Sequence, residues 1–207
     1  MKKLISILLG FLLIGCQQKT DTATADAALC TCPPVIALQP CNGFTQAEAK
    51  RLIPALQRFI KDYSGVDLDF DVLPPVKLPD ELKVTKTKYG ARGIITKLSK
   101  EKHANGYYVV VALTHDDIAT NHRGQKNWGI LGLAIHARYT CVASDHRLRN
   151  PKRDYWKVVA HEFIHTYHGY SHCPKDDVSC IMKDAKGKAD FSNKSKLCNT
   201  CRQALNK

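Results

Sequence analysis

The strongest restriction on the fold comes from an H-E-x-x-H segment at residues 161–165. Asn150 followed by Pro151 is typical of a helix start, with an N-cap and then proline at the first helical position, and Gly169 is typical of a helix end. We therefore expect one helix between these signals. On a helix, histidines four residues apart face the same side one turn from each other. Both can then bind one Zn²⁺ at about 2.0–2.1 Å, and Glu162 can reach the open coordination position.

The residues after this helix extend the pattern. Residues 166–173 contain a glycine, then a histidine, then a cysteine, and with the H-E-x-x-H segment they resemble the metzincin pattern H-E-x-x-H-x-x-G-x-x-H. The cysteine after the third histidine, together with Cys180-Ile181-Met182 and Cys198-Asn199-Thr200-Cys201, narrows the resemblance to the archaemetzincin family. Residues 112–118 and 144–149 also resemble archaemetzincin segments, so the similarity spans roughly residues 89–205.

This resemblance implies a zinc metallopeptidase that acts on peptide or protein substrates. It implies a zincin-like fold of the α/β (α+β) class, with a twisted mixed β-sheet layered with helices. It also implies Glu162 as the catalytic general base and Met182 in a Met-turn beneath the metal. The implied metal ligands form two sets: His161, His165 and His172 for the catalytic zinc, and Cys173, Cys180, Cys198 and Cys201 for a structural zinc.

The chain departs from the family pattern in its spacing. Three residues rather than two separate His165 from Gly169, six rather than four separate Cys173 from Cys180, and fifteen rather than seventeen separate Met182 from Cys198.

His168 therefore competes with His172 as the third histidine ligand. It shares a helical face with His161, but seven residues at a rise of about 1.5 Å place the two roughly 10 Å apart, too far for both to join His165 on one tetrahedral ion. We prefer His172, with the extra residue accommodated by a π-bulge or a wider turn at Gly169 and with His168 near the cleft but off the metal.

The cysteines allow two interpretations. The four near the C-terminus are typical of a Cys₄ zinc site, whereas an exported protein meets an oxidising compartment in which they could form two disulfides. Four further cysteines, an even number, could also pair with one another. They are Cys30, Cys32, Cys41 and Cys141.

The N-terminus predicts export and lipidation. Lys2 and Lys3 precede an apolar run from Leu4 to Ile14, which is too short to span a bilayer but fits a signal peptide. Leu13-Ile14-Gly15-Cys16 resembles the bacterial lipoprotein cleavage box, which implies that residues 1–15 are removed and that Cys16 carries the lipid anchor. Gln17 after the cysteine implies the outer membrane of a bacterial cell envelope.

Residues 16–44, rich in Thr, Ala, Asp and Pro, predict a flexible tether, with a peptidase domain over 45–172 and a cysteine-rich C-terminal subdomain over 173–207. Thr45 and Glu48 form a capping box for a helix through Tyr63 that Pro54 should kink or shorten. Apolar periodicity predicts the other elements: strands at 66–72, 107–113, 129–135 and 139–143, and a helix at 86–101.

The formal charge of +12, or +10 without Lys2 and Lys3, leaves open a second class of function. A basic, zinc-binding C-terminus could hold an anionic polymer while the histidine site is inactive, although export argues against nucleic acid as the partner. The sequence sets no oligomeric state. The residue that stabilises the oxyanion also stays open among Tyr139, Tyr155 and Tyr170.

Overall fold

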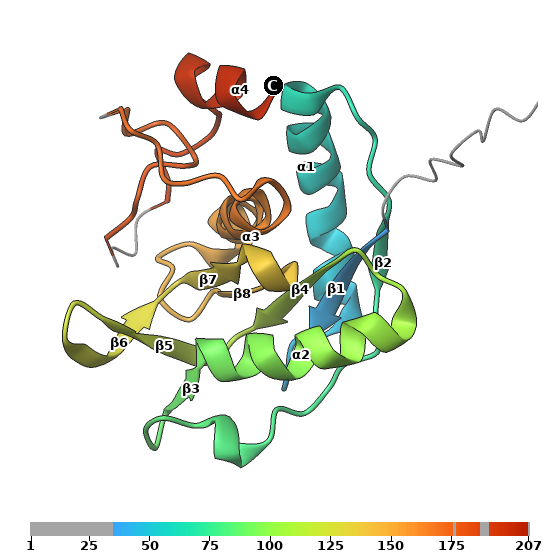
Figure 1. The fold of residues 1–207 in the computed structure, drawn as a ribbon, viewed down its shortest axis with the longest axis vertical. Coiled ribbons are helices and arrows are strands. Elements are labelled where there is room, and N and C mark those ends of the chain that lie inside the picture. Colours follow the sequence, from blue (N-terminus) through green and yellow to red (C-terminus); the bar gives the residue numbers. More distant parts are fainter. Residues whose placement is uncertain (1–34, 176, 187–190, 207) are drawn as a thin grey trace, which may run out of the picture. The chain divides into compact units, whose positions relative to one another are not determined.

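A mixed five-stranded sheet forms the centre of the fold in the computed structural model, which describes residues 35–175, 177–186 and 191–206 (Figure 1). The strand order is β2-β1-β4-β8-β7. Neighbouring strands pair in parallel except β7, which is an antiparallel edge strand next to β8. The bounds are β1 Ile36–Pro40, β2 Phe70–Val72, β4 Val109–Thr114, β7 Gly132–Ile135 and β8 Thr140–Ser144. Cys16, Cys30 and Cys32 lie outside the described residues.

The position of β1 corrects the prediction of a tether that extends to residue 44. Ile36–Pro40 is buried along its whole length and pairs with both β2 and β4, so it is an interior strand. A parallel strand covered on both faces is apolar on both and shows no alternation. The short run Val35–Leu38 therefore carried no period-two signal and was hidden by the Thr- and Pro-rich residues around it.

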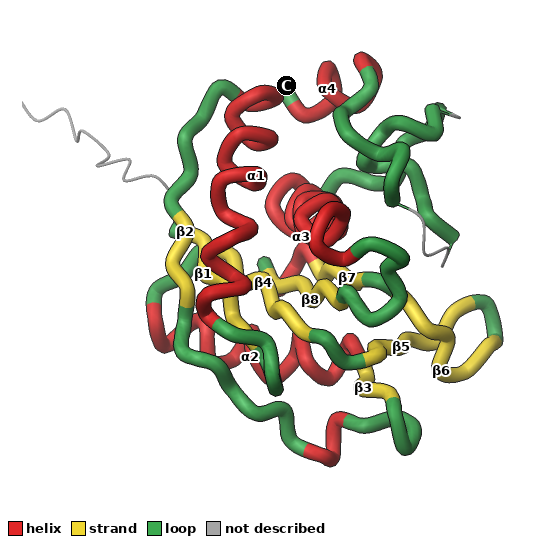
Figure 2. The backbone as a smooth tube through the Cα atoms, turned by 180° about the vertical axis from the view of Figure 1, so that it is seen from behind, coloured by secondary structure: helices red, strands yellow, loops and turns green. Residues whose placement is uncertain are grey.

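Helices cover both faces of this sheet (Figure 2). The helices α1, Gln46–Ser64, and α3, Pro151–His168, share one hydrophobic core with one face of the sheet. On the other face α2, Ala91–Asn105, packs in a second core. The short helix α4, Asn199–Leu205, follows at the C-terminus, and the 3₁₀ turns are η1, Asp80–Leu82, and η2, His136–Arg138.

The first long helix confirms its predicted cap but not the predicted effect of its proline. Thr45 accepts a hydrogen bond from the backbone N–H of Glu48, and the Glu48 carboxylate accepts one from the backbone N–H of Thr45. The helix continues through Pro54 to Ser64 and ends at Gly65, whose φ of 72° lies in the left-handed region. Its length therefore follows from the cap, the apolar face and the terminal glycine.

A second sheet, of order β3-β5-β6, corrects the prediction of one strand over 129–135. Its strands are β3 Lys88–Gly90, β5 Asp117–His122 and β6 Gln125–Ile130. The β5–β6 hairpin turns at Arg123 and Gly124, which both have positive φ (46° and 81°), as a two-residue type I′ loop requires. After Ile130 the chain crosses into β7 of the main sheet. The predicted 129–135 strand is thus divided between two sheets, and the predicted helix at 86–101 starts only at Ala91.

The C-terminal residues do not build a core of their own within the described part of the chain. Cys173, Ile181, Met182 and Leu197 belong to the same hydrophobic cluster as α1, α3 and the main sheet. No helix among the described residues is long and apolar enough to cross a membrane.

Candidate metal centre and catalytic cleft

The helix α3 carries the histidines and forms as its sequence predicts. Asn150 accepts a hydrogen bond from the backbone N–H of Arg153, Pro151 opens the first turn, and Gly169 ends the helix with φ 64°. It is α-helical to His168, so a turn at Gly169, and no π-bulge, accommodates the extra residue. Its middle, including Phe163 and Ile164, is buried against the sheet.

Three histidines from α3 and the following segment converge at one point. His161, His165 and His172 each offer a ring nitrogen, and these three nitrogens lie within 4.8 Å of one another. The Nε2 atoms of His161 and His165 are 3.0 Å apart. The His172 ring lies 5.2 Å and 4.8 Å from the other two ring centroids. Three imidazoles around one point, with space left on the cleft side, match the donor set of a catalytic zinc site.

Backbone carbonyls orient two of these rings. Nδ1 of His161 donates to the carbonyl oxygen of Ile181 at 2.8 Å, and Nδ1 of His165 donates to the carbonyl of Tyr170. In both rings Nε2 is thereby left free to face the centre of the cluster. Burial lowers the pKa of His165 and His172, and burial with the neighbouring His165 holds the pKa of His161 well below its usual value. All three rings are therefore neutral at pH 7, which is the form that binds metal.

His168 lies outside this cluster. Its Nε2 is 3.0 Å from the Tyr63 hydroxyl of α1, and its ring packs against Tyr63 and Tyr167. The structure thus brings His172, and not His168, to the other two histidines, in the arrangement that the sequence favoured.

Glu162 lies beside the histidines, buried to 6% exposure, and lines the same cleft. Burial raises the pKa of its carboxyl to about 8. The facing strand β7 leaves room for this side chain only because it begins with a glycine: a Cβ on Gly132 would lie 2.5 Å from Cγ and Oε1 of Glu162. The sequence did not predict this role of Gly132. A glycine inside an apolar run does not indicate which side chain lies opposite it in the fold.

The cleft has a volume of about 560 Å³, and the β5–β6 hairpin forms one wall. None of the three tyrosines considered for the oxyanion lines it. The Tyr155 hydroxyl donates to the Ala143 carbonyl in the core, Tyr170 donates to Sγ of Cys201, and Tyr139 packs on Tyr108. The polar groups along the hairpin wall are instead Thr120, His122, Arg123 and Gln125. The Arg123-Gly124 turn was the sequence signal that could have revealed this wall.

The four C-terminal cysteines form a second cluster. One sulfur from each of Cys173, Cys180, Cys198 and Cys201 lies within 4.8 Å of the others, and all four are free thiols. The sulfur pairs 173–198 and 180–201 are 3.6 Å and 3.7 Å apart. A tetrahedral site with Zn–S bonds of about 2.3 Å needs sulfurs roughly 3.8 Å apart, whereas a disulfide needs about 2.05 Å. The geometry therefore fits a Cys₄ metal site and differs from the two-disulfide interpretation.

Two of the remaining cysteines can be placed as well. Cys41 and Cys141 are both buried free thiols rather than a disulfide. Burial raises the pKa of Cys41 to about 12 and also raises that of Cys141. These thiols are packed, protonated and unreactive.

Comparisons with solved structures identify the fold. An archaemetzincin from Methanopyrus kandleri superposes with a TM-score of 0.65 at 23% identity, covering 84% of this chain and 93% of that one. A zinc-dependent peptidase from Methanocorpusculum labreanum gives 0.60 at 18% identity, covering 83% and 100%. An archaemetzincin from Archaeoglobus fulgidus, complexed with malonate, gives 0.58 at 20%, covering 82% and 98%. No protein-family model and no curated protein matches the sequence.

The fold is therefore that of a zinc-dependent peptidase. Within that class it is the archaemetzincin fold, which confirms at the level of architecture the resemblance seen in the H-E-x-x-H segment and in the histidine and cysteines that follow it.

Proposed function

We propose that this chain is a zinc-dependent metallopeptidase of the archaemetzincin type, which hydrolyses peptide bonds in peptide or protein substrates. The observation that carries the proposal is the convergence of three neutral imidazoles within 4.8 Å on a cleft that Glu162 also lines. The fold adds support, because it is shared with structures described as archaemetzincins and a zinc-dependent peptidase.

His161, His165 and His172 would hold the catalytic zinc. A zinc ion bound there supplies an acidified water and polarises the scissile carbonyl. Glu162 takes the proton of the attacking water and passes it to the leaving amine, so no covalent enzyme intermediate forms. Once Glu162 has taken this proton, the burial that raises the pKa of its carboxyl favours the protonated form until the proton passes to the amine.

Replacement of Glu162 by Gln separates this proposal from the binding-module alternative. The amide keeps the shape of the carboxyl but cannot accept the proton, so hydrolysis should fall by roughly 10²–10⁴-fold while the zinc content stays the same. A binding module would be indifferent to the change. The proposal fails if wild type and Glu162→Gln have equal activity towards a peptide substrate at equal metal content.

We further propose that the cysteine cluster holds a second, structural zinc. Metal content per chain, measured by inductively coupled plasma mass spectrometry, should be two zincs for the wild type and one for either His161→Ala or Cys198→Ser. One zinc in the wild type, lost only in His161→Ala, would leave the catalytic site in place and remove the structural one. No zinc at the histidines would refute the peptidase.

We also propose that the chain is a lipoprotein of the bacterial cell envelope, anchored through Cys16. The support is the Leu13-Ile14-Gly15-Cys16 string after a short apolar run. Two or more acyl chains give durable anchoring without a transmembrane helix. Cells labelled with a clickable palmitate analogue should label the wild type, and Cys16→Ala should lose the label and leave the membrane fraction. An unchanged membrane fraction for Cys16→Ala would refute the anchor.

A further inference from the structure

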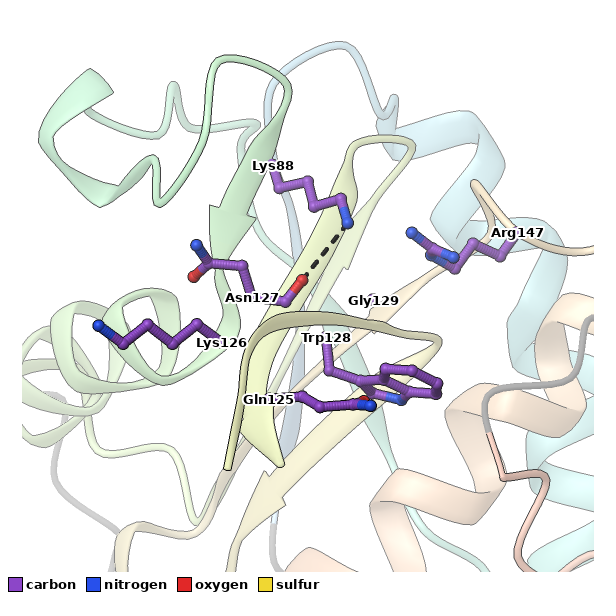
Figure 3. A pocket seen from close by; sticks show the side chains of 7 residues that line it. All are labelled: Lys88, Gln125, Lys126, Asn127, Trp128, Gly129 and Arg147. Carbon is purple, nitrogen blue, oxygen red and sulfur yellow. Dashed lines mark hydrogen bonds between the residues drawn. The ribbon is translucent and has the colours of Figure 1, made fainter. Parts of the chain in front are cut away.

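A second pocket adjoins the catalytic cleft on the outer side of the β5–β6 hairpin. It has a volume of about 600 Å³ and is lined by Lys88 of β3, by β6 and by Arg147, which precedes α3 (Figure 3). Gln125 and Trp128 line both this pocket and the catalytic cleft. The two spaces therefore meet at these two side chains, and an extended chain bound at the histidines can reach Trp128.

The charges along this path are mainly positive. Apart from Glu162 and the histidines, one carboxylate and five cations line the two pockets. The carboxylate is Asp184, and the cations are Lys88, Arg123, Lys126, Arg147 and Lys186. The Asp184 carboxylate already accepts a hydrogen bond from the backbone N–H of Lys186 at 2.8 Å. The charge of Arg147 is compensated by its ion pair with Asp117. Four other cations still face one carboxylate, so positive charge is in excess along the path.

Two of these cations are held in place by the fold. The Arg147 guanidinium donates to both carboxylate oxygens of Asp117, at 2.7 Å and 2.8 Å, and lies over Gly129, where any side chain would collide with it. Nζ of Lys88 donates to the Asn127 carbonyl at 3.4 Å. Figure 3 shows these two cationic groups on either side of Gly129. Fixed cations lose little conformational freedom when they bind an anion.

Arg123 is the member of the set that lies on the hairpin wall of the cleft itself. It occupies the tip of the hairpin, is exposed, and forms no ion pair with any residue that the structure describes. Trp128 on the same hairpin wall is 39% exposed, and its ring lies tilted to the His122 ring with the centroids 6.5 Å apart. On this wall, the Arg123 guanidinium could bind the carboxylate of an Asp or Glu side chain, and the Trp128 ring could contact its methylene groups.

We infer that the hairpin selects peptides that carry aspartate or glutamate on the side of the scissile bond that lies along β5–β6. This inference rests on the proposed peptidase function and names its substrate class. We favour a peptide over nucleic acid or another polyanion as the ligand of these cations. The cationic side chains lie along the hairpin wall of the same cleft as Glu162 and the histidines, where a peptide would be cleaved.

The test uses the purified full chain in detergent and a series of quenched fluorescent peptides that differ at one position, with Asp, Asn or Lys. We expect kcat/KM for the Asp peptide to exceed that for Asn by roughly two- to tenfold, to exceed that for Lys by more, and to lose this advantage as salt rises. Arg123→Glu should reverse the order of Asp and Lys. The matched control is Lys50→Glu, an exposed reversal of the same charge on α1, which should leave the order unchanged.

Binding provides a readout that does not need turnover. In the Glu162→Gln chain, tryptophan fluorescence, to which Trp128 and Trp156 both contribute, should report tighter binding of the Asp peptide than of the Asn peptide. Arg123→Glu should abolish the difference. Equal cleavage and equal binding of all three peptides would overturn the inference while the peptidase stands. Cleavage of none of them, together with no zinc at the histidines, would instead refute the proposed function. Displacement of the Asp peptide by a DNA oligomer at lower concentration would overturn the inference in favour of a general polyanion site.

Discussion

Gly132→Ala tests whether the position of Glu162 is set by the facing strand. The new Cβ would lie 2.5 Å from Cγ and Oε1 of Glu162 and 2.6 Å from Cδ, whereas ordinary contacts begin near 3.4 Å. The carboxylate must therefore shift by about 1 Å, and a displacement of that size at a reacting group can cost about 10²-fold in rate. Most of the contacting atoms are at the end of a flexible side chain, so the cost in stability should be near the low end of overpacking, about 1 kcal/mol.

The assay is kcat/KM for a quenched fluorescent peptide, measured beside zinc content and the free energy of unfolding in urea. Gly132→Ala should lose about 10²-fold in kcat/KM at unchanged zinc content, because no histidine is displaced. Gly43→Ala is the matched control, since a Cβ on Gly43 meets no atom within 4 Å. Wild-type kcat/KM in Gly132→Ala would refute the assignment of Glu162 as a closely positioned base. A loss of zinc would show that the strand acts on the histidines instead.

His168→Ala should keep both zincs, because His168 bonds to Tyr63 and not to the histidine cluster, and should cost about 1 kcal/mol of stability for the lost hydrogen bond; a zinc loss measured by mass spectrometry would contradict this. His115 should make stability depend on pH: burial opposes its charge, but the Asp145 and Glu48 carboxylates raise its pKa above the usual value. This contribution to stability is full below the unfolded-state pKa of His115 and is lost as the pH rises through its raised folded-state pKa. In His115→Asn, the free energy of unfolding measured in urea should therefore change less with pH between those two values, by less than about 1 kcal/mol. If the free energy of unfolding depends on pH equally in wild type and His115→Asn, the proposed contribution of His115 is refuted.

The sequence predicted the elements whose signals are local. The helix α3 follows from Asn150, Pro151 and Gly169, and its histidine pair follows from the four-residue spacing. Long-range pairing was harder to predict. Residues 129–135 form one apolar run, yet they divide between two sheets, because β6 pairs with β5 while β7 pairs with β8. Periodicity describes which faces of a strand are apolar and does not identify the partner strand.

The sequence predicted which histidines and cysteines lie together, and it did not predict the walls of the cleft beside them. Histidine and cysteine side chains are themselves common metal ligands, so their residue type and spacing were enough to predict them from the sequence. The roles of Gly132 and Arg123 depend on what lies opposite them in space: Glu162 opposite the glycine, and the cleft opposite the arginine. Tyrosines are chemically suited to an oxyanion, but in Tyr155 the hydroxyl is already committed to a core carbonyl.

The histidine cluster and the cysteine cluster share backbone segments, so we expect the cysteine cluster to help position the histidines. Cys180 directly precedes Ile181, whose carbonyl orients the His161 ring. On the other side, Cys173 directly follows His172, and the backbone N–H of Cys173 donates to the carbonyl of Met182 at 2.8 Å. A structural ion bound by Cys173 and Cys180 would therefore fix the carbonyl that accepts from His161 and the backbone next to His172.

Different cysteines should therefore have different effects on the histidine site. Cys180→Ser releases the segment that carries the Ile181 carbonyl, and loss of such an outer partner typically weakens a metal site by about 10–100-fold. Cys198→Ser removes a proposed ligand of the same cluster, but Cys198 does not directly adjoin the residue whose carbonyl orients His161, as Cys180 does. Chelator competition on the remaining zinc should show the weakening in Cys180→Ser and much less in Cys198→Ser. Equal zinc affinity in the two variants would mean that α3 alone holds His161 in place.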